Sequence, residues 1–279
     1  MSSSVTSSRA PLLVLGTRPS LREYLHDLWS RRHFVMALAT TDLRVRHMNS
    51  VLGQLWHLVN PALMITVYYF VFGVVLDARR GIDHYVTFLV TGVMTFRLAQ
   101  ATITGCASAI PKNLGLIRSI QFPRALVPVS ISIQNVLGFL PGFALVVLVG
   151  VLEGVPPSWS LALLPAVIAV GAVFSLGLGL DAARLGAGYS DFQQILPHAF
   201  RVLLYVSGVL FSVQNSIANE TVRTVLSLNP FYGLIELARW CVLDTPLHDT
   251  GVVSFAAWTA VGLVGGLKFF RAAEFRYGA

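Results

Sequence analysis

The sequence predicts an all-α integral membrane protein with six transmembrane helices and both termini in the cytoplasm. Hydrophobic residues make up 55% of the 279 residues and charged residues only 12%, and the mean hydropathy is +0.69. An average soluble domain carries about 25% charged residues, so this chain has too few to cover a surface exposed to water. Apolar runs of about 20 residues recur along it, which is the length that a helix needs to cross the hydrocarbon core.

Six apolar runs are predicted to be the transmembrane helices. They lie at residues 54–76, 86–110, 126–152, 160–181, 198–214 and 251–268. Cytoplasmic loops of membrane proteins carry an excess of Lys and Arg. Most of the 20 basic residues fall in the N-terminal segment, in the loop between the second and third runs, in the tail, and at Arg184 and Arg201 before the fifth run. This distribution places both termini in the cytoplasm.

The segment before the first span is predicted to contain an amphipathic helix in the membrane interface. Ser20 and Glu23 have the spacing of a helix capping box. Apolar residues then follow on one helical face: Leu21, Tyr24, Leu25, Leu28 and Trp29. With Arg22, Arg31 and Arg32 beside this face, the helix would rest in the cytoplasmic headgroup layer. The alternative is a helix that packs on a soluble partner.

Between the fifth and sixth spans, the moderately apolar segment 214–251 is split by Asn229 and Pro230. Neither half is long enough to cross the membrane, so we expect short re-entrant helices. Such backbone is tolerated at membrane depth only where protein or a water-filled cavity covers it. The predicted regions are a flexible cytoplasmic N-terminus (1–19), the interfacial helix region (20–53), the six-helix domain (54–268) and a cytoplasmic tail (269–279).

Motifs of enzymes and of metal sites are missing from the sequence. It has no phosphate-binding G-x-x-x-x-G-K-[ST], no H-E-x-x-H and no paired-cysteine motif. A match to G-x-G-x-x-A at Gly177, Gly179 and Ala182 lies inside an apolar span, where small residues let helices approach closely. The histidines are scattered singly, and no basic run is interleaved with aromatic residues as in nucleic-acid binders. We therefore expect no enzyme activity, no metal, no cofactor and no nucleic-acid partner.

Arg97 is the first candidate site residue, because it lies near the middle of the second span. A charged side chain at that depth is costly and marks a functional site by default. It is expected to face a cavity or a polar cluster with Gln100, one helical turn further on. The alternative is a shifted span in which Arg97 reaches an interface with its long side chain.

Aromatic residues in two spans form the second candidate. Tyr68, Tyr69 and Phe72 lie in the outer half of the first span, and Tyr205 and Phe211 lie in the fifth. Aromatic faces suit sugars, whose C–H surfaces stack on them. A belt of aromatic residues at the outer membrane interface explains the same pattern, so both interpretations stay open.

Three segments together resemble a known family, the membrane subunits of ABC-2-type polysaccharide exporters. The segments are "SVLGQLWHLVNPAL", "NLGLIRSIQFPRALVP" and "NPFYGLIELAR", in this order along the chain. The matching residues of the first two are Ser50, Leu52, Gly53, Trp56, Pro61, Asn113, Leu116, Ile117, Phe122, Pro123 and Arg124. The likeness covers nearly the whole chain and is greatest to the galactan-exporting permeases (Wzm type) of mycobacteria and their relatives.

The resemblance implies a multi-pass plasma-membrane permease that works as a homodimer with two copies of a separate ATP-binding subunit. ATP and Mg would be bound by that partner, which accounts for the missing phosphate-binding motif. The implied substrate is a polysaccharide such as galactan or O-antigen on a polyprenyl diphosphate carrier, and it would move from the cytoplasmic to the outer face.

The resemblance also assigns roles to particular residues. The implied contact with the ATPase uses Lys112, Asn113, Leu116, Ile117, Arg118 and Arg124. The lipid diphosphate would enter beside Arg44 and Arg46, and the polymer would leave beneath the re-entrant helices. Residues implied at this exit are Asn229, Pro230, Tyr232, Glu236 and Arg239. The sequence leaves open an ABC-2 permease for a drug or small lipid, a membrane-embedded transferase, and a structural scaffold.

Overall fold

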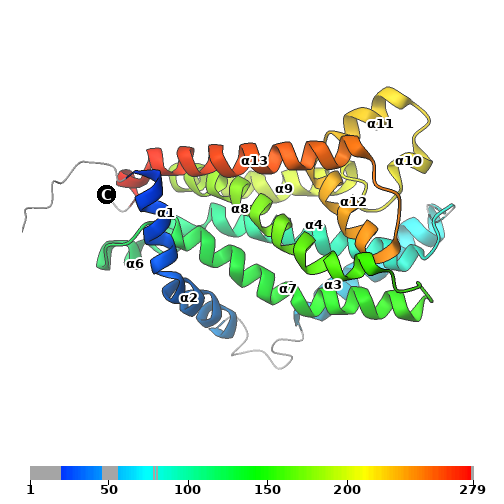
Figure 1. Cartoon of the computed structure of the whole chain (residues 1–279), viewed down its shortest axis with the longest axis horizontal. Helices are drawn as coiled ribbons and strands as arrows, with labels where there is room; N and C mark the ends of the chain where they lie inside the picture. Colours follow the sequence, from blue (N-terminus) through cyan, green and yellow to red (C-terminus); the bar gives the residue numbers. More distant parts are fainter. Residues whose placement is uncertain (1–19, 46–55, 78, 80, 278–279) are drawn as a thin grey trace, which may run out of the picture.

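The computed structural model describes residues 20–45, 56–77, 79 and 81–277, and this part of the chain folds into helices without a β-strand (Figure 1). The first half contains α1 (Leu21–Ser30), α2 (Arg32–Val45), α3 (Trp56–Tyr68), the π-helix η2 (Tyr69–Val75), α4 (Tyr85–Ala107), α5 (Ala109–Lys112), α6 (Leu114–Ser119) and α7 (Leu126–Leu152). The second half contains the 3₁₀-helix η3 (Trp159–Leu163), α8 (Leu164–Gly188), α9 (Ser190–Val206), α10 (Val213–Ser216), α11 (Glu220–Ser227), α12 (Pro230–Leu243), α13 (Asp249–Ala272) and the 3₁₀-helix η4 (Glu274–Arg276).

Four helices in the described residues are long and apolar enough to cross a membrane. They are α4, α7, the continuous helix formed by η3 and α8, and α13. They match the predicted second, third, fourth and sixth spans, and α7 runs over the predicted residues 126–152. The first predicted span corresponds to α3 and η2, which contain a shorter apolar stretch at Ala62–Val75.

The predicted boundaries of the fifth span, 198–214, are wrong. The helix in this region, α9, covers Ser190–Val206 and is only 17 residues long. It ends because Gly208 adopts a positive φ of 64°, a conformation that a glycine reaches without steric cost. The prediction followed the apolar run through Phe211 and so missed the polar first turns of the helix.

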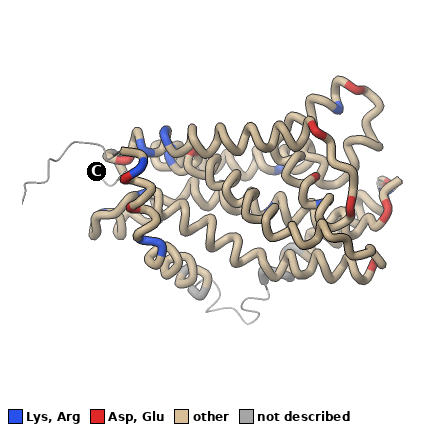
Figure 2. Tube along the Cα trace, viewed as in Figure 1, with Lys and Arg blue, Asp and Glu red and all other residues tan. Residues whose placement is uncertain are grey.

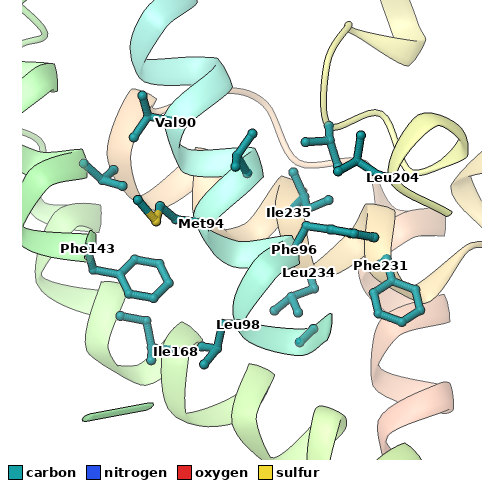
Figure 3. Close-up of a cluster of buried hydrophobic side chains, with 14 of the residues drawn as sticks. Val90, Met94, Phe96, Leu98, Phe143, Ile168, Leu204, Phe231, Leu234 and Ile235 are labelled. Atoms are coloured by element: carbon teal, nitrogen blue, oxygen red, sulfur yellow. The ribbon is translucent and has the colours of Figure 1, made fainter. Parts of the chain in front are cut away.

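The helices pack around α4, which is the most deeply buried of the four candidate spans. Figure 3 shows its side chains Val90, Met94 and Phe96 within a cluster that also contains Phe143 of α7 and Phe231 of α12. The fluid hydrocarbon of a membrane gives helices little hydrophobic reason to associate, so close packing of such side chains holds the bundle together.

Small residues let α8 and α13 approach at backbone distance. A Cβ atom added to Gly177 would lie 2.7 Å from the backbone of Gly262, and one added to Gly266 would lie 2.3 Å from the Gly177 carbonyl oxygen. Gly179 faces the Cys106 side chain in the same way. These contacts confirm the structural interpretation of the G-x-G-x-x-A segment.

The amphipathic helix before the first span is present as α1. The Ser20 side chain accepts a hydrogen bond from the Glu23 backbone, and the Glu23 side chain accepts one from the Ser20 backbone, so the capping box is confirmed. Tyr24 is buried, whereas Leu25 and Trp29 are exposed. The helix therefore packs on the bundle with one part of its apolar face and leaves another part uncovered.

The two ends of the bundle differ in charge. Lys and Arg gather at the end that carries α1, α6 and the end of α13, while the end near α10 and α11 carries mainly Asp and Glu (Figures 1 and 2). The helical middle of the bundle carries few charged residues.

Candidate functional site

A stripe of polar side chains runs along the exposed side of α9. Its members, at helical spacing, are Gln194, His198, Arg201 and Tyr205. The opposite side of α9 buries Phe200 and Leu204 in the core. Exposed Ile195 and Val202 lie beside the stripe on the same helix, so α9 presents a polar strip and an apolar strip side by side.

A second polar stripe lies on α4, although most of this helix is buried. Arg97, Gln100, Thr104 and Ser108 follow one another at helical spacing, and all four are only partly buried. The Thr104 hydroxyl donates to the Gln100 carbonyl oxygen (2.7 Å). The polar side of α4 therefore continues from the middle of the helix to its end near α5.

Tyr68 of α3 brings the two stripes together. Its hydroxyl interacts with the guanidinium of Arg97 and lies within electrostatic range of Arg201 and Tyr205. One turn further along, the Phe72 and Tyr205 rings lie 6.4 Å apart between centroids. We call the surface formed by Tyr68, Phe72, Arg97, Arg201 and Tyr205 the open face.

Four of the six residues predicted to line the substrate path thus meet on the open face, and two do not. Tyr69 turns toward Tyr85, with a ring separation of 6.2 Å. Phe211 lies beyond the break at Gly208 and packs, partly buried, against the hydrophobic core.

Arg201 of the open face and His198 of the polar stripe on α9 were missed by the sequence interpretation, which counted Arg201 with the cytoplasmic charges. The rings of Phe96 and Phe200 lie 6.0 Å apart, which puts Arg201 at the level of Arg97 in the middle of α4. The helical spacing of the polar residues from 194 to 205 is the signal that could have identified them.

At the other end of the bundle, the backbone break after α9 is held by Arg239 of α12. Its guanidinium donates to the carbonyl oxygens of Phe88 (3.2 Å), Gly208 (2.9 Å) and Val209 (2.8 Å). Its Cζ atom lies 3.3 Å from the centre of the Phe88 ring. A Cβ added to Gly92 would lie 2.6 Å from Nη2, so this glycine makes room for the side chain.

The remaining residues predicted at the exit also lie around this break. The predicted split falls between α11 and α12, with Asn229 as the cap and Pro230 as the first residue of α12. The Asn229 side chain accepts from the Phe231 backbone and donates to the Ser207 hydroxyl (2.9 Å). Tyr232 donates to Glu236 (3.3 Å), which also contacts His248. A cavity of about 300 Å³ opens here, lined by Tyr232, Glu236, Arg239, Gln214, His248 and others.

The residues predicted to contact an ATPase lie at the end of the bundle that carries α1. Ile117 is buried and anchors α6, Leu116 and Asn113 are partly buried, and Lys112 and Arg118 are exposed. The Asn113 side chain donates to the carbonyl oxygen of Ala109 (2.8 Å). This segment therefore has a fixed apolar side and a basic outer side.

Arg124 belongs to a different contact, which joins three distant segments. The Tyr24 hydroxyl donates to Glu274 Oε1 (3.0 Å), and the same oxygen accepts the Arg124 backbone N–H (2.7 Å). Burial and the Glu274 carboxylate raise the pKa of Tyr24. The Tyr24 hydroxyl therefore stays protonated at physiological pH and remains a donor to Glu274. The Arg124 Nη1 atom is buried. We call Tyr24, Arg124 and Glu274 the α1–tail node.

The structure does not describe the side chains of the two residues predicted at the entry of the lipid diphosphate. Arg46 lies outside the described residues, and so does the side chain of Arg44, although its backbone belongs to α2. Across the described part of the chain, no three His, Cys, Asp or Glu side chains gather closely enough to hold a metal ion.

The chain is similar to bacterial proteins named for the export of O-antigen or the transport of polysialic acid. It is 28% identical to the O-antigen export system permease protein RfbA of Myxococcus xanthus, covering 86% of this chain and 92% of that protein. It is 27% identical to the protein of the same name in Klebsiella pneumoniae, covering 91% and 95%. It is 22% identical to the polysialic acid transport protein KpsM of Escherichia coli, covering 86% and 93%.

The family assignment rests on a match that covers most of the chain. The model of the ABC-2 type transporter family matches residues 33–243, a range that includes the open face, the α5–α6 segment and α12. Together with several long apolar helices, this match makes the protein a multi-pass protein of the inner membrane. The chain therefore belongs to the ABC-2 type transporter family.

Proposed function

We propose that this chain is the permease subunit of an ATP-driven exporter that moves a lipid-linked polysaccharide from the cytoplasmic to the outer face of the plasma membrane. The open face is the single observation that carries the proposal. It joins aromatic rings to polar groups along α3, α4 and α9, beside helices that are otherwise apolar. The relatives named for the export of O-antigen and the transport of polysialic acid support this class of substrate.

The open face explains why the permease would work as a homodimer. A polar surface that includes two arginines is costly against hydrocarbon, and a single copy leaves Arg201 and Tyr205 exposed. A second copy placed against this side would enclose the polar stripes in a water-filled path. A sugar chain moving through it would stack on Phe72 and Tyr205 and exchange hydrogen bonds with Gln194, His198 and Gln100.

The proposed topology has six crossings with both termini inside. The first crossing would be α3 with η2, and the fifth would be α9, completed by the irregular segment that follows it. The 17 residues of α9 rise by about 25 Å, which falls short of a hydrocarbon core of about 30 Å. The gathering of Lys and Arg at the α1 end supports a cytoplasmic position for that end.

Energy would enter through two copies of a separate ATPase that bind the α5–α6 segment. Exposed Lys112 and Arg118 supply charge for this contact, and buried Ile117 transmits its movement to the bundle. The α1–tail node joins the loop that contains Arg124 to α1 and to the tail, so these segments would move together. The motifs of the sequence favour a galactan-type polymer on a polyprenyl diphosphate, with Arg44 and Arg46 where this carrier enters.

Purification of the tagged chain from its native cells, followed by identification of the proteins recovered with it, tests the proposal. We expect an ATPase with a phosphate-binding motif in about equal amount, and we expect depletion of the chain to accumulate lipid-linked polymer inside the cells. Recovery without any ATPase, under conditions that preserve other transporter complexes, would contradict the energy source. Normal surface polymer after depletion, with accumulation of a small lipid instead, would favour the small-substrate alternative.

A further inference from the structure

The open face contains two arginines at the same depth, on either side of one tyrosine. Arg97 of α4 interacts with the Tyr68 hydroxyl, and Arg201 of α9 lies within electrostatic range of it. The contact between the Phe96 and Phe200 rings (6.0 Å) fixes the relative height of the two helices at this point. The arrangement is therefore set by the packing of α4 on α9 and not by the flexible ends of the side chains.

In the described part of the chain, no acidic group forms an ion pair with these two cations. The helices α3, η2 and α4 contain no Asp or Glu, and α9 contains only Asp191, in its first turn. Asp191 lies ten residues before Arg201, which is about 15 Å along a helix. Among the described residues, neither Arg97 nor Arg201 has an ion pair.

Arg239 is an arginine with a structural role in this protein. It is 5% exposed, and three backbone carbonyl oxygens and an aromatic ring occupy its guanidinium. Arg97 is only partly buried, and Arg201 is exposed. Arg239 is therefore explained by its packing and by the backbone carbonyl groups that it bonds. The same explanation does not apply to Arg97 and Arg201.

We infer that Arg97 and Arg201, with Tyr68 between them, form a binding site for a phosphate or carboxylate group of the cargo. Guanidinium groups bind both anions with paired, charge-assisted hydrogen bonds. An anion between them would offset two charges that are costly at this depth, and the Tyr68 hydroxyl would add a further donor. This inference rests on the proposed function, since it places the site in the path of the exported molecule.

The anion has two possible sources, the diphosphate of the carrier lipid and acidic groups on the sugar chain. Both satisfy the same donors, so the test uses one probe for each. Geranylgeranyl diphosphate is compared with geranylgeraniol, which lacks the anion, and trigalacturonate is compared with the neutral galactotriose. The complex, purified from its native cells, is placed in nanodiscs of phosphatidylcholine to avoid competition by anionic lipids, and binding is measured by calorimetry.

Variants assign the binding to the two arginines. The double variant R97Q/R201Q removes both charges, R97K/R201K keeps them, and R22Q/R223Q removes two arginines outside the open face as a matched control. We expect one anionic probe or both to bind at least tenfold more tightly than the neutral analogue. We expect R97Q/R201Q to abolish this preference, R97K/R201K to retain part of it, and R22Q/R223Q to leave it unchanged.

The probe that shows the effect identifies the source of the anion. Equal binding of both anionic probes and their neutral analogues, or an unchanged preference in R97Q/R201Q, would overturn the inference. Export of polymer is measured separately in cells that carry the same variants. Full export by R97Q/R201Q would overturn the site and leave the proposed function standing. A lack of polymer export by the unaltered chain would refute the proposed function, whatever the calorimetry shows.

Discussion

The open face and the break after α9 both contain arginine within the helix bundle, and they use it in opposite ways. At the break, Arg239 is buried and donates to three carbonyl oxygens. On the open face, Arg97 and Arg201 have no ion pair in the described part of the chain and are not fully buried. Backbone carbonyl oxygens thus occupy the guanidinium of Arg239, whereas on the open face the Tyr68 hydroxyl interacts with Arg97, and Arg201 stays exposed. The comparison indicates a binding site where the fold leaves an arginine without a counter-ion.

The largest expected effect is on stability, at the break. Replacement of Arg239 by Leu removes the donors for Gly208 and Val209, and a buried carbonyl without a partner costs about 1–3 kcal/mol. We expect R239L to lower the thermal unfolding temperature strongly and to reduce the yield of folded protein, with R239K intermediate. Thermal unfolding in detergent, followed by size-exclusion chromatography, measures both. An R239L variant as stable as the unaltered protein would remove the distinction between the two regions.

The same substitution on the open face should have the opposite pattern. Replacement of Arg97 by Leu removes a partly buried charge that has no ion pair among the described residues, so the fold loses little by it. We expect R97L to fold at least as stably as the unaltered protein and to lose polymer export by tenfold or more. Export is measured as surface polymer in cells that contain equal amounts of each variant. Unchanged export with normal assembly would show that Arg97 has no functional role.

Gly92 offers a finer test of the Arg239 site, because a Cβ at this position would lie 2.6 Å from Nη2. We expect G92A to displace the guanidinium and to destabilise the protein by about 1–3 kcal/mol, the usual cost of overpacking a core. Gly265 of α13 provides the control, since no atom lies within 4 Å of its Cβ position. We expect G265A to be neutral or stabilising in the same unfolding assay, and equal destabilisation by both variants would point to a general intolerance of larger side chains.

The α1–tail node should show a smaller effect, on the coupling of ATP hydrolysis to export. In E274Q the side chain keeps one acceptor oxygen and its shape but loses the charge, and hydrogen bonds to charged groups contribute about 1.5–3 kcal/mol. We expect export to fall a few-fold while ATP hydrolysis by the purified complex is retained. Y24F removes the hydroxyl that donates to Glu274 and should behave similarly. Parallel loss of hydrolysis and export would indicate a defect in assembly instead of coupling.

The smallest expected effect comes from the aromatic rings of the open face. Contacts between aromatic rings contribute about 0.5–1.5 kcal/mol beyond burial, so Y205L or F72L should reduce export only a few-fold without loss of stability. Y69L serves as the comparison, because Tyr69 packs on Tyr85 away from the open face. Equal losses in all three variants would favour the interpretation of these residues as an interface belt.

The sequence predicted the bounds of a helix where that helix is uniformly apolar or begins with a recognisable capping motif. The bounds of α7 were predicted as observed, and the capping box of Ser20 and Glu23 predicted the start of α1. The pattern failed at α9, where polar residues facing the open side lower the hydropathy of a helix that still buries Phe200 and Leu204. A search for apolar runs therefore shifts the predicted bounds of such a helix toward its most apolar residues.

Contacts between distant segments could not be predicted from the sequence, for a different reason. Tyr24 and Glu274 are 250 positions apart, and no local pattern links a helix that begins before the first span to a tail that follows the last. The pairing of Arg239 with carbonyl groups of α4 and of the break is equally invisible, since backbone carbonyls have no signature in the sequence. Arg97 was recognised by its depth alone, whereas its neighbour Arg201 required the packing of α9.

Accessibility to water of the open face and of the polar stripe on α9 that continues it tests the central claim most directly. Single cysteines at Gln194, His198 and Tyr205, introduced into the complex in native membranes, are treated with a charged thiol reagent that does not enter lipid. Cysteines at Val261 and Val264, which are exposed on α13, provide the comparison. The account predicts fast reaction at the three α9 positions and none on α13, because only α9 would border a water-filled path. Protection of the α9 positions equal to that on α13 would show that this face lies against lipid or protein, and would contradict the account.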